Sequence, residues 1–181
     1  MGGRTPTHYR RPQEPTAAHT GCRSEEEQMR PLGGEVTLHM DAPPDRVWAL
    51  ISDVTRIGEF SPETVAGRWT GGSTGPEVGA TFAGKVVRNG VGPTYWSACR
   101  VTRCEPERVF EFSVGTKKVA VNNWGYRLQP SGGGTDVTEY YRLEPMLPLR
   151  VYWALLGRMR GRTNEQGMRT TLERMKAVLE G

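Results

Sequence analysis

The sequence of 181 residues has few of the residues that build disulfide, metal or cofactor sites: three cysteines and three histidines. Cys22, Cys99 and Cys104 form no CxxC pair and leave an odd thiol, which argues against a disulfide framework and a zinc knuckle. No two histidines have metal-ligand spacing. The glycine-rich runs at 71–75 and 131–134 lack the GxxxxGK[ST] pattern of a phosphate-binding loop. We therefore expect neither a metal nor a cofactor.

Long apolar runs are also missing. No segment approaches the run of about 20 apolar residues that a membrane span requires, and the first residues lack the apolar core of a secretory signal. We expect a cytoplasmic protein without integral membrane association. The net charge is +4, and from Pro148 onward seven basic residues face three acidic ones. A basic helix can attract nucleic acid or an anionic membrane surface, but it can equally be a solvated face. Since no nucleic-acid-binding motif accompanies it, we expect no nucleic-acid partner.

Composition divides the chain into two parts. Residues 1–33 contain four prolines and few aliphatic side chains, so they cannot bury enough surface to offset the entropy of ordering. We predict a disordered N-terminal arm over 1–33 and one folded domain over 34–181.

Strands dominate the middle of the chain. Val36, Leu38 and Met40 alternate with Thr37 and His39, the period of a half-buried strand. Six more strands are predicted, at 64–70, 80–88, 94–103, 109–114, 119–129 and 136–143, with turn-forming residues between them. Because the connections are short and contain no helix, the strands should form an antiparallel meander.

Helices are predicted in two places. Pro44 suits the first turn of a helix that carries Val47, Leu50, Ile51 and Val54 on one face, and a second short helical segment covers 53–60. One long amphipathic helix should follow from 148 to 180. The fold class is therefore α+β, of the helix-grip type: a curved antiparallel sheet of about seven strands wrapped around one long C-terminal helix, with two short helices after strand 1. One helix cannot fill such a concavity, so an internal cavity is expected.

Three segments carry a resemblance to a known superfamily. They are DAPPDRVWALISDVTRIGEFSPE (41–63), WSACRVTRCEPERVFEFSV (96–114) and NNWGYRLQPSGGGTDVTEYYRL (122–143). With the long final helix, they make the chain resemble the SRPBCC superfamily, the START-like helix-grip group that includes lipid carriers and bacterial polyketide cyclases. It is most similar to the actinobacterial polyketide cyclase/dehydrase-like branch. The resemblance implies the fold, but the branch has no fixed catalytic set to carry over, and the fold hosts many functions.

The candidate site follows from strand parity. Phe110 and Phe112 share one face of their strand, as do Trp124 and Tyr126, and the hairpin at 131–134 would bring Glu139 onto the same wall. A carboxyl group in an apolar wall has a raised pKa and suits acid/base chemistry or a polar anchor. Alternatively, Glu139 pairs with an arginine or faces water. The candidate ligand-binding residues are Phe82, Phe110, Phe112, Trp124, Tyr126, Glu139, Tyr141, Trp153 and Leu156, and Glu139 is the candidate catalytic residue.

Three functions remain open from the sequence. The first is binding of a hydrophobic small molecule of lipid, polyketide or isoprenoid type in a cavity between the sheet and the C-terminal helix. The second is a polyketide aromatase/cyclase that uses orientation and one acid/base group in the same cavity. The third is a regulator that docks a partner through the basic helix. We favour the first, with a monomer or homodimer as the expected state.

Overall fold

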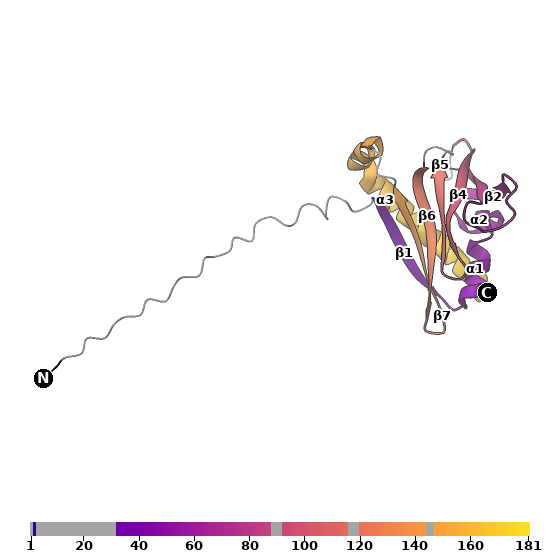
Figure 1. The fold of residues 1–181 in the computed structure, drawn as a ribbon, viewed down its shortest axis with the longest axis horizontal. Coiled ribbons are helices and arrows are strands. Elements are labelled where there is room, and N and C mark those ends of the chain that lie inside the picture. The colour runs from indigo at the N-terminus through magenta and orange to yellow at the C-terminus, as the bar shows by residue number, and fades with distance from the viewer. Residues whose placement is uncertain (1, 3–31, 88–91, 116–119, 144–146) are drawn as a thin grey trace. The chain divides into compact units, whose positions relative to one another are not determined.

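The computed structural model describes residues 2, 32–87, 92–115, 120–143 and 147–181, without the side chains of 147–160. One antiparallel sheet of seven strands has the order β1-β7-β6-β5-β4-β3-β2 (Figure 1). The strands are β1 (Gly33–Met40), β2 (Thr64–Thr70), β3 (Thr81–Val86), β4 (Tyr95–Glu105), β5 (Val109–Gly115), β6 (Ala120–Ser131) and β7 (Gly134–Leu143). The helices are α1 (Pro44–Ile51), η2 (Val54–Arg56), α2 (Ile57–Phe60) and α3 (Leu147–Glu180). The predicted α+β helix-grip fold is confirmed.

The ends of the strands differ from the prediction by a few residues. β1 begins at Gly33, ahead of the alternating segment, and Leu143 donates its backbone N–H to the carbonyl of Leu32 at 2.7 Å. β4 continues to Glu105 past a register shift between Val101 and Arg103. That shift breaks the alternation that marks a strand in the sequence. The predicted disordered arm at 1–33 lies outside the described residues, except for Gly2, Leu32 and Gly33.

Three short helices, α1, η2 and α2, fold over the concave face of the sheet after β1, where the sequence predicts two. Pro44 lies in the first turn of α1, where its missing N–H costs nothing. Asp53 then caps η2, because its carboxylate accepts the backbone N–H of Thr55 at 3.0 Å. A Cβ at Gly67 of β2 would collide with the Val54 carbonyl, so the glycine lets η2 approach the sheet closely.

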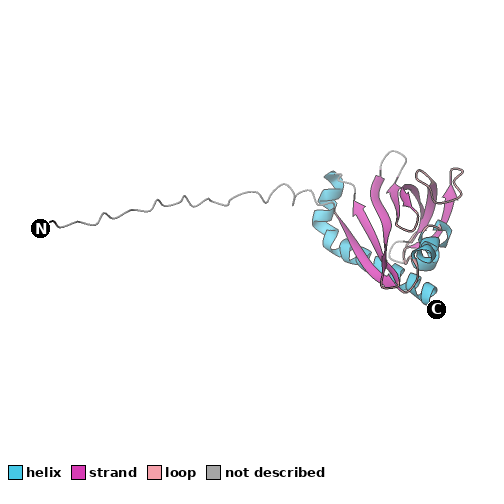
Figure 2. Cartoon of the chain, turned by 60° about the horizontal axis from the view of Figure 1, so that its bottom comes forward, coloured by secondary structure: helices cyan, strands magenta, loops and turns pink. Residues whose placement is uncertain are grey.

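Helix α3 crosses the concave side of the curved sheet (Figure 2). Over the part whose side chains are described, Met168, Leu172 and Met175 are almost completely buried at helical spacing. Two contacts fix its C-terminal end to the last residues of β1 and the residue that follows the strand. Lys176 Nζ donates to the carbonyl of His39 at 2.8 Å, and Glu180 Oε1 accepts the backbone N–H of Asp41 at 2.7 Å.

The convex face of the sheet carries its own buried polar group. The Tyr140 ring lies over Gly125, where a Cβ would come within 2.6 Å of the tyrosine hydroxyl. That hydroxyl donates to Glu111 at 2.8 Å, and the other Glu111 oxygen accepts from Thr102 at 2.8 Å. Arg127 stacks over the same ring at 4.9 Å. Glu111 is therefore fully paired on the side of the sheet that faces away from the core.

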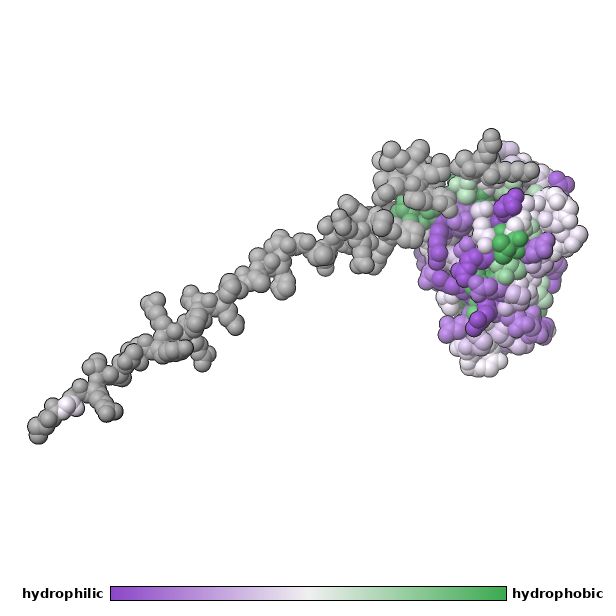
Figure 3. Space-filling view, viewed as in Figure 1, coloured by the Kyte–Doolittle hydropathy of each residue, from purple (hydrophilic) through white to green (hydrophobic). Residues whose placement is uncertain are grey.

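The surface seen in Figure 3 is mostly hydrophilic, with small apolar areas between the polar ones. None of the helices in the described part of the chain is both long and apolar enough to cross a membrane. The buried apolar side chains gather in one cluster between the sheet and its helices.

Candidate functional site

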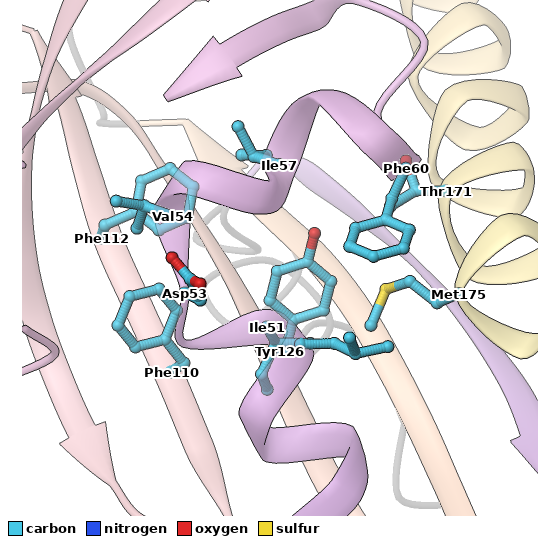
Figure 4. Close-up of a pocket in the computed structure, with 11 residues that line it drawn as sticks. Ile51, Asp53, Val54, Ile57, Phe60, Phe110, Phe112, Tyr126, Thr171 and Met175 are labelled. Atoms are coloured by element: carbon cyan, nitrogen blue, oxygen red, sulfur yellow. The ribbon is translucent and has the colours of Figure 1, made fainter. Parts of the chain in front are cut away.

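A pocket lies between the concave face of the sheet, the three short helices and α3 (Figure 4). Its cavity volume is only about 20 Å³. That is room for about one water molecule. The pocket is lined by Leu50, Ile51, Asp53, Val54, Ile57, Phe60, Phe110, Phe112, Tyr126, Thr171 and Met175. Nine of these eleven side chains are apolar or aromatic, as in sites that bind hydrophobic molecules.

Aromatic rings form the sheet side of this space. In Figure 4, Phe110 and Phe112 lie opposite Phe60 and Met175, with the Tyr126 ring between the two groups. Phe112 packs edge-on against Phe82 of β3, with ring centroids 5.0 Å apart. Such contacts stabilise the wall beyond the area that they bury.

A second aromatic pair extends the wall along the sheet. Trp124 stacks on Tyr141 with ring centroids 5.1 Å apart. Tyr141 is buried and Trp124 is half-buried. Trp124 lies two residues before Tyr126 on the same strand, so both side chains face the concave side.

Glu139 lies on this concave wall, directly opposite Tyr126 in the register of β6 and β7. Its side chain is 6 % exposed, and Glu139 Oε1 accepts a hydrogen bond from the Tyr126 hydroxyl at 3.1 Å. Burial raises the pKa of Glu139 to about 8, and the hydrogen bond from Tyr126 opposes part of that rise. Burial and the nearby carboxyl raise the pKa of Tyr126 well above 10. At neutral pH the pair is therefore an uncharged acid beside an uncharged phenol.

The second carboxyl oxygen of Glu139 is an exception among buried polar atoms. Glu139 Oε2 is buried and has no hydrogen-bond partner among the residues that the structure describes; Asn122 Oδ1 on the same face of β6 is in the same state. An unpaired buried polar atom is costly, and most such atoms in proteins are paired. The wall therefore offers hydrogen-bonding capacity that the described protein groups do not use.

Most of the residues predicted from the sequence lie together on the concave side. Phe110, Phe112 and Tyr126 line the pocket, while Phe82, Trp124, Glu139 and Tyr141 belong to the surrounding wall. Trp153 and Leu156 lie on α3, but their side chains are outside the described part. The ligand-binding role of the nine residues, and the catalytic role of Glu139, stay predictions.

Eight of the eleven lining residues are not among the ligand-binding residues predicted from the sequence. Leu50, Ile51 and Val54 belong to the apolar helical face that the sequence predicts, whereas Asp53 and Thr171 are not among its candidate residues. The signal was present in the spacing of Leu50, Ile51 and Val54, which turns one face of α1 and η2 toward the sheet. Nothing in the sequence indicated which part of the sheet that face would cover.

The described residues give little support to a metal site or a reactive thiol. They contain no group of three His, Cys, Asp or Glu side chains placed to hold a metal ion. Burial raises the pKa of the Cys99 thiol to about 12, and a thiol that stays protonated is a poor nucleophile.

Comparison with known proteins places this fold in a family. No curated protein matches the sequence. A structure of a "Polyketide_cyc-like" protein from Corynebacterium glutamicum is 28% identical, with a TM-score of 0.52 over 83% of this chain and 90% of that one. Proteins from Arthrobacter aurescens and Chromobacterium violaceum show the same fold at 20% and 16% identity. Their TM-scores are 0.60 and 0.58, over 82% and 83% of this chain and 86% and 99% of theirs.

The match at the level of family covers the whole described domain. Residues 34–180 match the family described as "Polyketide cyclase / dehydrase and lipid transport". This family is of SRPBCC type, which confirms the resemblance read from the three sequence segments. The match extends from the second residue of β1 to the last residue of α3. The chain belongs to the polyketide cyclase/dehydrase and lipid transport family of the SRPBCC superfamily.

Proposed function

We propose that the protein binds an apolar small molecule, of lipid, polyketide or isoprenoid type, in the pocket between the sheet and its helices. The observation that carries this proposal is the lining: nine apolar or aromatic side chains and two polar ones, gathered from six elements and the residue just before η2. The family description, which names lipid transport beside polyketide cyclisation, supports the same class of ligand.

The size of the space adds a requirement. A volume that admits about one water molecule cannot hold a lipid or a polyketide without movement of its walls. The short helices α1, η2 and α2 are the natural part to move, since they cover one side of the pocket and belong to no sheet. Binding should therefore be accompanied by displacement of residues 44–60.

A matched pair of tryptophans provides the test. Trp124 is half-buried on the concave wall, whereas Trp96 is 45 % exposed and stacks with Arg68 on the convex side. Native mass spectrometry of the full chain should reveal a co-purified apolar molecule. Trp124→Ala should weaken its binding by about 1–3 kcal/mol, the scale of a buried side chain. Trp96→Ala should leave the affinity unchanged. Equal effects of both substitutions, or no binding of any apolar molecule, would contradict the proposal.

A second candidate function is polyketide cyclisation, and Glu139 is the observation that favours it. A carboxyl group with a pKa near 8 beside a phenol can hold or release a proton at physiological pH. For an enzyme, Glu139→Gln should leave binding intact and lower turnover of a poly-β-ketone substrate by about 10²–10⁴-fold. For a carrier, the same substitution changes no reaction, because there is none. We favour the carrier.

A further inference from the structure

The unpaired oxygen of Glu139 indicates what the ligand must bring to the pocket. We infer that Glu139 recognises its ligand by donating a hydrogen bond from Oε2 to a carbonyl or similar acceptor oxygen on an uncharged, otherwise apolar molecule. This inference rests on the proposed function, because it assumes that a ligand enters the pocket. It goes beyond that function by assigning a polar contact that selects among apolar ligands.

The direction of the hydrogen bond follows from the geometry of the pair. The Tyr126 hydroxyl donates to Glu139 Oε1, so Oε1 acts as the acceptor. When the carboxyl is protonated, its hydrogen then resides on Oε2, the oxygen without a described partner. Oε2 is thus a buried donor, and a ligand oxygen is the group that satisfies it.

The position of Glu139 connects this donor with the pocket. Its register neighbours are Val36 on β1 and Tyr126 on β6. The Tyr126 ring is itself part of the pocket lining, and its hydroxyl is bonded to Glu139. Glu139 itself does not line the closed pocket, so a ligand comes next to the carboxyl group on the Tyr126 side when the walls move apart.

The charges around the site favour an uncharged ligand. Tyr126 is the titratable group that faces Glu139 from β6, and Val36 faces it from β1. The helices bring Asp53, Thr171 and apolar side chains to the pocket, and none of the lining residues is basic. An anionic ligand would lose its hydration without finding a cation in this lining. Asp53 is the acidic residue of the lining, and its Oδ1 already accepts the backbone N–H and the hydroxyl of Thr55, at 3.0 and 2.6 Å.

A pair of nearly isosteric probes separates the hydrogen bond from apolar contact. 2-Acetylnaphthalene carries a C=O group where 2-isopropenylnaphthalene carries C=CH₂. Dissociation constants of both probes for the full chain are measured at pH 6.5 by NMR titration. We expect the ketone to bind about tenfold more tightly, because only the ketone satisfies Oε2. Glu139→Met, which removes the donor, should reduce this preference to about one.

Titration of the donor provides the second readout. At pH 9.5 the carboxyl is ionised and cannot donate, so the wild-type preference for the ketone should disappear. Glu139→Gln keeps an N–H donor that does not titrate and should keep its preference at both pH values. Glu111→Gln alters the buried carboxyl on the convex face and serves as the matched control, with the preference and its pH dependence unchanged.

The outcomes distinguish the inference from the proposed function. Equal affinity of both probes at pH 6.5, or a wild-type preference that persists at pH 9.5, overturns the role of Glu139 while leaving the pocket as a binding site. A preference that survives in Glu139→Met overturns it as well. Binding of neither probe to the folded wild-type protein counts against the proposed function itself.

Discussion

The buried carboxyl of Glu139 should make the stability of the protein fall as the pH rises. Folding moves its pKa from 4.5 to about 8. Between these values the unfolded chain has released the proton and the folded chain still holds it. The free energy of unfolding therefore decreases with increasing pH in this window. The contribution of Glu139 is fully present below pH 4.5 and is lost by about pH 8.

The size of the effect follows from the same two pKa values. Each pKa unit corresponds to about 1.36 kcal/mol, so the shift from 4.5 to about 8 changes the free energy of unfolding by on the order of 5 kcal/mol. Glu139→Gln removes the titration but keeps an oxygen that can accept from Tyr126. We therefore expect the variant to gain stability relative to the wild type by about 3–5 kcal/mol between pH 4.5 and pH 8.

Urea denaturation of both proteins at half-unit pH steps, followed by circular dichroism, measures this difference. His39 and Asp136, which hydrogen-bond each other at 2.7 Å on the convex side, titrate in both proteins. Their influence therefore cancels in the difference between the two curves. Parallel curves, with a difference that stays within about 1 kcal/mol from pH 4.5 to pH 8, would refute the reasoning that Glu139 is buried as a neutral acid.

Three further predictions test the architecture. Leu172→Ala on α3 should lower the free energy of unfolding by about 2–5 kcal/mol, because the side chain is fully buried. Val178→Ala, on the exposed side of the same helix, should change it by less than about 0.5 kcal/mol. Melting temperatures that fall equally in both variants would mean that the helix faces are assigned wrongly. Gly67→Ala should destabilise the protein, because a Cβ at this position collides with the Val54 carbonyl. Amide hydrogen exchange should show that residues 54–60 lose protection. Unaltered exchange in these residues would contradict the close packing of η2 on β2. Deletion of residues 1–30 should leave cooperative melting intact, since that composition cannot build a core; loss of the transition would place part of the core in the arm.

Strand parity made the concave wall predictable. Side chains alternate strictly along a strand, so placing Val137 inward also places Glu139 and Tyr141 inward. The hairpin then sets which residues face each other. Ser131 pairs with Gly134 across a loop of Gly132 and Gly133, whose positive φ angles suit glycine. Counting back along both strands from this turn brings Tyr126 opposite Glu139.

Contacts between distant segments were not predictable in the same way. Tyr140 belongs to the outward set of β7, where parity predicts exposure, yet it is buried because Gly125 leaves a hollow for its ring. Asp53 and Thr171 reach one pocket from parts of the chain 118 residues apart, and their meeting depends on how α3 crosses the sheet. The register of a strand is local, whereas the position of a helix on a sheet is a property of the whole packed core.

The closed state of the pocket has a consequence for how affinity relates to stability. Arg174 on α3 donates to the Phe60 carbonyl at 3.3 Å and so joins the end of α2 to the long helix beside the pocket. If the pocket must open to admit a ligand, the measured dissociation constant is the intrinsic constant divided by the open fraction, so a form open 1% of the time weakens binding about 100-fold. Arg174→Met removes this hydrogen bond. It should therefore raise the apparent affinity for the ligand while it lowers the melting temperature. In such a protein, the variant that binds its ligand most tightly is not the variant that is most stable.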